Sequence, residues 1–162
     1  MPTHELLSRE ERNLYNPAFA GLLVARAVQG HEQEYGSGCH VLLAVLAPVM
    51  ALTAPVRAVL PGSISSTTVN WIERESAARV HLRQAAPLLG PLVREGLLLS
   101  LRAGVLVLEE QHLLRSTRRI PKKIAGGTSE VSEMQKASLF LGRWLPRAGD
   151  LPTTFTLLGV RP

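Results

Sequence analysis

The residues that could carry enzyme chemistry are few and poorly spaced. Cys39 and His40 are adjacent, but a nucleophilic thiolate needs its histidine within hydrogen-bond reach and a third group that orients the ring. The alternative for Cys39 is a small buried side chain at the start of a helix. The histidines are His4, His31, His40, His81 and His112. They show no metal-ligand spacing with carboxylates, so we predict no metal site.

The short motifs of nucleotide enzymes and hydrolases are also missing from the sequence. There is no G-x-x-x-x-G-K-[ST] phosphate loop, no three-glycine dinucleotide fingerprint and no H-E-x-x-H pair. The Gly-Ser-Gly of residues 36–38 lacks the flanking positions of a nucleophile elbow, which indicates a loop. We therefore expect a protein that is not an enzyme, has no catalytic residues and binds no cofactor. A small hydrolase that uses Cys39 or a histidine is the alternative.

Basic residues gather in one part of the chain and give the strongest local signal. The net charge is +5, and residues 111–147 hold eight basic side chains against two acidic ones. The densest stretch is the basic loop, residues 115–127, with Arg115, Arg118, Arg119, Lys122 and Lys123. Such a loop can bind the phosphates of duplex DNA or an acidic protein surface. No aromatic residue is interleaved, so stacking on single strands is not expected.

Composition predicts one ordered domain that positions these residues. A chain of 162 residues that are 46% hydrophobic can bury a core without disulfides or metals. The single cysteine excludes a disulfide framework. The mixed-charge N-terminus lacks the apolar core of a signal peptide, so we expect a cytoplasmic protein. We expect an N-terminal lead-in over 1–15 and a single domain over 16–162.

The most apolar stretch, residues 41–52, could be a membrane span or a core helix. It is much shorter than the roughly 20 apolar residues that a spanning helix needs. Pro48 also interrupts it. We predict a deeply buried helix over 41–51 and no contact with a membrane.

Capping signals predict the other helices of the N-terminal half. Asn16 is a good cap for a helix over 17–35, which Gly36 ends. Shorter helices follow over 53–60 and 66–75. The candidate caps for these two are Thr53 for the first, and Ser65 or Ser66 for the second.

Two prolines are expected to break the next helical stretch. Pro87 and Pro91 each remove a backbone donor, so we predict a separate helix over 91–103. Apolar residues cover most of its circumference. A helix of this kind is central to a fold or is covered by a partner. Leu98 lies within its narrow polar stripe and is therefore expected to be exposed.

The C-terminal half is expected to contain a β-hairpin followed by a helix. Residues 105–108 and 112–116 are short enough for the two strands of a β-hairpin, with 109–111 as the turn. Beyond the basic loop, a helix is predicted over 129–145. A helix followed at once by a basic-edged hairpin is typical of a winged-helix domain. We predict a mainly α fold with a small β-hairpin: a winged-helix-like helical domain with a C-terminal helix and a docked tail.

The last ten residues, TTFTLLGVRP, form an apolar tail. The tail could pack under the 129–145 helix or contact a partner. We predict that Phe155 and Leu158 are buried and that 160–162 lie at or near a subunit contact. The predicted partner-contact residues are Leu98, Phe140, Trp144, Phe155, Leu157, Leu158 and Val160. Core packing is the equal alternative for Trp144.

Several segments, in this order, resemble a known family. They are NPAF (16–19), APVRAVLP (54–61), REGLLLSLRAGVL (94–106), KASLFLGRW (136–144) and LLGVRP (157–162). The chain resembles the middle component of prokaryotic three-component ABC systems over residues 12–162, with a loose match over 63–89.

The resemblance implies partners and a setting that the residues alone do not give. It implies an ABC ATPase similar to DNA-repair and chromosome-maintenance ATPases, a third component from the same operon, and action against phages or other mobile DNA. The middle component would then be an adaptor without catalytic residues. A free-standing winged-helix protein that binds duplex DNA through the basic loop is the alternative.

Overall fold

The chain is mainly α-helical, with one small sheet. The computed structural model describes residues 15–117, 120–121, 123–124 and 127–162. The helices are α2 (Pro17–Tyr35), α3 (Val41–Leu52), α4 (Ala54–Arg57), α5 (Thr68–Arg74), α6 (Ser76–Arg102), α7 (Ser129–Trp144) and α8 (Leu151–Leu158). The strands are β1 (Cys39–His40), β2 (Leu106–Glu109) and β3 (Leu113–Ser116). The predicted mainly α class with a β-hairpin is confirmed.

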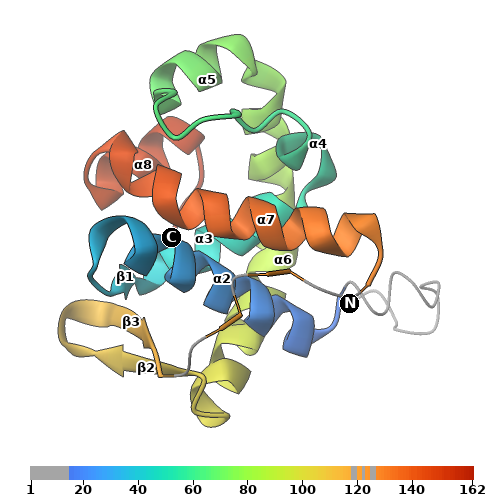
Figure 1. Cartoon of the computed structure of the whole chain (residues 1–162). Coiled ribbons are helices and arrows are strands. Elements are labelled where there is room, and N and C mark those ends of the chain that lie inside the picture. The colour runs from blue at the N-terminus through green and yellow to red at the C-terminus, as the bar shows by residue number, and fades with distance from the viewer. Residues whose placement is uncertain (1–14, 118–119, 122, 125–126) are drawn as a thin grey trace.

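Helix α2 lies between α6 and α7 at the centre of the fold (Figure 1). Its predicted start and end are confirmed. The Asn16 side chain accepts a hydrogen bond from the Ala18 amide at 2.8 Å, and Gly36 ends the helix in the left-handed conformation. Eleven of the twelve positions over 20–31 are buried, and only Leu22 is partly exposed. A helix that is buried on all sides needs neighbours on all sides, and α3, α6 and α7 supply them.

Glycines let α2 approach its two neighbours closely. At the crossing with α6, a Cβ on Gly96 would lie 2.5 Å from the backbone nitrogen of Gly21. At the crossing with α7, a Cβ on Gly142 would overlap the carbonyl oxygen of Ala27, and one on Gly30 would overlap that of Leu139. Non-bonded heavy atoms prefer separations of about 3.5–4.0 Å. Only glycine therefore permits these helix separations.

The predicted buried helix over 41–51 is confirmed as α3. Eight of its residues are buried, including Pro48 inside the helix. The His40 side chain caps its start by accepting from the Leu42 amide at 3.2 Å. Across the described residues, no helix combines the length and the apolar character needed to cross a bilayer.

The predicted break at Pro87 and Pro91 is wrong. Helix α6 is continuous over 27 residues and contains both prolines. It runs from α5 to the sheet, behind α2 and α7 in Figure 1. Each proline removes one backbone hydrogen bond. Burial of Leu82, Val93 and Leu97 on the core side offsets this loss, because tertiary packing overrides local propensity.

The predicted caps of the two short helices need correction. Thr67, rather than Ser65 or Ser66, caps α5 by accepting from the Asn70 amide at 3.2 Å. Thr53 stands before α4 but makes no side-chain cap there. Its hydroxyl instead donates to the Val49 carbonyl at 2.7 Å, because Thr53 also follows directly on α3 as its C-terminal cap.

The sheet has the strand order β1-β3-β2, with both pairs antiparallel. The predicted hairpin is confirmed, with Leu106 opposite Ser116 and Glu109 opposite Leu113. The turn lies over 110–112 rather than the predicted 109–111, because Glu109 still pairs with Leu113, and Gln111 and His112 both have positive φ. The two-residue strand β1 was not predicted from the sequence. The winged-helix assignment stays a prediction.

Beyond α7, a 3-10 helix over Leu145–Ala148 leads into α8. The helical form of the tail was not predicted, although its signals are present. The Asp150 side chain accepts from the Thr153 amide at 2.8 Å, and Gly159 ends the helix in the left-handed conformation. Phe155 and Leu158 are buried, as predicted. The division into a lead-in and a single domain stays a prediction, and residues 1–14 lie outside the described part.

Candidate interaction surfaces

Trp144 is a core residue of the chain. It is 0% exposed, and its ring meets that of Trp71 edge-on with centroids 5.4 Å apart. The indole nitrogens donate to backbone carbonyls, Trp144 to Ser66 and Trp71 to Val59, each at 2.7 Å. Of the two alternatives for Trp144, the structure shows core packing. Phe140 stacks on its outer side with centroids 6.0 Å apart and extends the aromatic cluster towards the surface.

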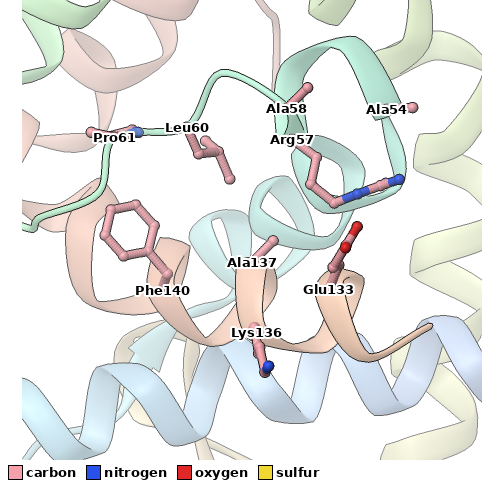
Figure 2. A pocket seen from close by; sticks show the side chains of 9 residues that line it. All are labelled: Ala54, Arg57, Ala58, Leu60, Pro61, Glu133, Lys136, Ala137 and Phe140. Atoms are coloured by element: carbon pink, nitrogen blue, oxygen red, sulfur yellow. The ribbon is translucent and has the colours of Figure 1, made fainter. Parts of the chain in front are cut away.

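Phe140 opens onto a groove between α4 and α7, which we call the Phe140 groove (Figure 2). Its volume is about 490 Å³. Figure 2 shows Leu60 and Phe140 on one side and Arg57 opposite Glu133 on the other. Arg57 is held in place because its guanidinium donates to the Ala51 carbonyl at 2.6 Å and to Glu130 at 3.1 Å. The groove therefore has an apolar end and a charged end.

The tail packs against the rest of its own chain. Val160 is buried, and its amide donates to the Phe155 carbonyl at 3.2 Å. Leu157 is only partly covered, and Arg161 and Pro162 are exposed. Residues 160–162 line a second groove, between α3 and α6, which we call the α3–α6 groove. The predicted subunit contact of 160–162 stays a prediction.

Leu98 is exposed on α6, as expected, with 53% of its surface accessible. It lines neither the Phe140 groove nor the α3–α6 groove. The predicted contact residues thus occupy the core, the edges of two grooves and the open face of α6, rather than one shared pocket. Their role in partner contact is a prediction that the structure of a single chain does not test.

The basic loop begins at an ion-paired residue. Arg115 forms a 2.9 Å salt bridge with Glu109 across the hairpin. This pair is solvent-exposed and therefore weak. Lys123 is exposed. Arg118, Arg119 and Lys122 lie outside the described residues.

A buried arginine that was not predicted binds the middle of the basic loop. Arg26 on α2 is 5% exposed. Its guanidinium donates to the Pro121 carbonyl at 2.6 Å, to Gln135 at 3.1 Å and to Gln29 at 2.9 Å. Gln29 donates to the Ile120 carbonyl at 2.8 Å. Burial lowers the pKa of Arg26. One charged residue within an apolar helical run was the signal available in the sequence.

Cys39 and His40 do not form a catalytic pair. Cys39 is fully buried, and burial, with the Glu32 carboxylate adding to it, raises the pKa of its thiol to about 12. The thiol is therefore protonated at neutral pH, whereas a nucleophile must be a thiolate. The Nδ1 atom of His40 caps α3 instead of facing the sulfur. Within the described ranges, no three His, Cys, Asp or Glu side chains gather closely enough to hold a metal ion.

Comparison with protein families gives one match. The model of the family described as "ABC-three component (ABC-3C) system Middle Component 3" matches residues 4–162. The comparisons with curated proteins and with solved structures find no match.

Proposed function

The chain belongs to the Middle Component 3 family of ABC-three component systems, and we propose that it is a non-catalytic adaptor in such a system. It would couple an ABC ATPase that resembles DNA-repair and chromosome-maintenance ATPases to a third, variable component. The complex would act in the cytoplasm against phages or other mobile DNA.

Family membership is the observation that carries this proposal. The state of Cys39 supports it, because a buried protonated thiol is not a nucleophile. The surface also supports it, because two open, largely apolar grooves lie beside the tail and α7. Apolar patches rimmed by polar groups are typical of protein-interaction sites.

Co-expression with the two other components of the operon tests the proposal. Affinity purification through a tag on this chain should recover both components in fixed ratio. A chain that purifies as a stable monomer and binds neither component would contradict the proposal.

The tail gives a sharper version of this experiment. Deletion of 157–162 removes Leu158, which is fully buried, so that variant is expected to lose its fold as well as assembly. Deletion of 161–162 removes only exposed residues and should keep the thermal midpoint while weakening the complex. Full assembly by the 157–162 deletion would contradict a role for the tail.

A second candidate function is contact with duplex DNA through the basic loop. It is favoured by the attachment of the loop to α2 at Ile120 and Pro121, within a stretch of the sequence that is rich in cations. Gel-shift measurements at low salt test it with wild type and with Arg118→Ala and Lys122→Ala. Binding should weaken in both variants and fall steeply with salt. No shift by the wild type at low salt would remove this candidate.

A further inference from the structure

The α3–α6 groove contains an unfilled recess. Its volume is about 260 Å³. Val45 and Val49 line it from α3, Ala86 and Gly90 from α6, and Val160 from the tail. In Figure 1 the C-terminal end of the chain lies beside α3. The walls are therefore aliphatic and belong to three segments that are distant in sequence.

Gly90 forms the recess by lacking a side chain. It is buried, yet a Cβ at this position would meet no atom within 4 Å. Glycine in the interior of a helix is unfavourable unless the backbone needs positive φ or another element approaches closely. Gly90 has no positive φ, and nothing approaches it. The space beside it is open to an apolar group that the described part of this chain does not supply.

Unpaired arginines surround this recess. Arg94 and Arg161 line the groove itself. Arg79, further along α6, lies against Gly159 and donates to the Thr156 carbonyl at 3.2 Å. None of the three forms a salt bridge within the described residues. In the part of the chain that the structure describes, two arginine side chains and no Asp or Glu side chain therefore line the groove.

We propose that the α3–α6 groove receives an apolar side chain of a partner protein, flanked by Asp or Glu residues that pair with Arg94 and Arg161. The partner is one of the other components of the system, so this inference rests on the proposed adaptor function. Charge complementarity selects this occupant. A second copy docked symmetrically through the same groove would set arginine against arginine, and a phosphate backbone has no group for an apolar recess.

Filling the recess tests the inference directly. Gly90→Leu places a side chain where the anchor would lie, without an internal clash at Cβ. Gly62→Leu is the matched control, because a Cβ there also meets nothing and the residue is exposed outside the groove. The probes are the purified ABC ATPase and the purified third component, each titrated against the immobilised full chain.

We expect Gly90→Leu to weaken the binding of one component by at least tenfold while Gly62→Leu binds as wild type. Thermal melting checks that both variants are folded. Arg94→Glu should also weaken the same component by about tenfold, and raising the salt concentration should reduce wild-type binding. Arg102→Glu, on the exposed part of α6 outside the groove lining, is the charge control and should bind as wild type.

Two results would overturn the inference and leave the adaptor function standing. In the first, folded Gly90→Leu binds both components as tightly as wild type. In the second, Arg94→Glu loses binding but Gly90→Leu does not, which would indicate a purely electrostatic contact. A wild-type chain that binds neither component would overturn the adaptor function and the inference together.

Discussion

Gly90 and Gly96 lie six positions apart on α6 and serve opposite purposes. At Gly96 the backbone of α2 is so close that a Cβ would lie 2.5 Å from the Gly21 nitrogen. At Gly90 a Cβ would meet nothing within 4 Å. One glycine brings two helices together, and the other leaves space between two helices. The same residue type on one helix thus marks a tightly packed interface and an open recess.

The two glycines mark a region of the fold that is closely packed and a region that keeps open space. Helix α2 is closely packed against α6 and α7 through Gly21, Gly30 and Gly142. The α3–α6 groove is lined by buried and half-buried aliphatic residues and retains empty volume. Well-packed interiors leave few voids larger than a water molecule. The recess therefore differs from the core that surrounds it, and single substitutions can measure the difference.

The largest effect is expected from Gly96→Ala. The added methyl group would overlap the backbone of α2, which cannot move away without disturbing the crossing with α7. We expect a loss of about 3 kcal/mol in the free energy of unfolding, at the upper end of overpacking costs. Urea denaturation measures it, with Gly62→Ala as the control at an open position. A loss below 0.5 kcal/mol, on the order of a surface substitution, would show that the α2–α6 crossing is not tight.

A smaller loss is expected from Arg26→Met, which tests the polar part of the packed region. The variant keeps the apolar stem but leaves the buried side chains of Gln135 and Gln29 without their donor. Unpaired buried polar groups cost about 1–3 kcal/mol each, so we expect destabilisation of about 2 kcal/mol. Limited proteolysis should also cut faster near residue 121.

Arg102→Met, on the exposed surface of α6, is the control for this variant. It should change neither the unfolding free energy nor the proteolysis rate measurably. Equal cleavage of the Arg26→Met variant and wild type would mean that Arg26 does not hold the basic loop.

The smallest effect, and one of opposite sign, is expected from Gly90→Ala. Alanine is favoured over glycine in a helix interior by about 1 kcal/mol, and no atom opposes the added Cβ. The variant should therefore melt slightly above wild type. Gly104→Ala is the contrasting control, because its φ of +68° disfavours alanine and should lower the melting temperature. A destabilised Gly90→Ala would show that the recess is closed in solution.

Signals within a few residues predicted the ends of several helices from the sequence. Asn16 and Gly36 define α2 by capping chemistry that depends only on their neighbours, and the hairpin follows from two short stretches of strand length joined by polar residues. Effects of contacts between residues that are distant in the sequence could not be predicted. Helix α6 continues through Pro87 because distant residues bury its core face, and strand β1 exists only because β3 lies beside it.

The candidate surfaces follow the same division. The apolar character of the tail predicts that it is buried, and the burial of Phe155 and Leu158 confirms this prediction. The recess at Gly90 could not be predicted, because the sequence does not show which helix approaches which glycine. The hydrogen bonds of Arg26 could not be predicted for a related reason. Its acceptors lie about a hundred positions away along the chain, in the basic loop and on α7.

The way in which the basic loop is attached has a consequence for how its sequence can change. Arg26 and Gln29 bind the carbonyl groups of Pro121 and Ile120, and every amino acid supplies a backbone carbonyl. Side chains in this loop can therefore be exchanged while the attachment is kept. Substitutions can therefore change the charge of the loop while Arg26, Gln29 and these two hydrogen bonds are kept.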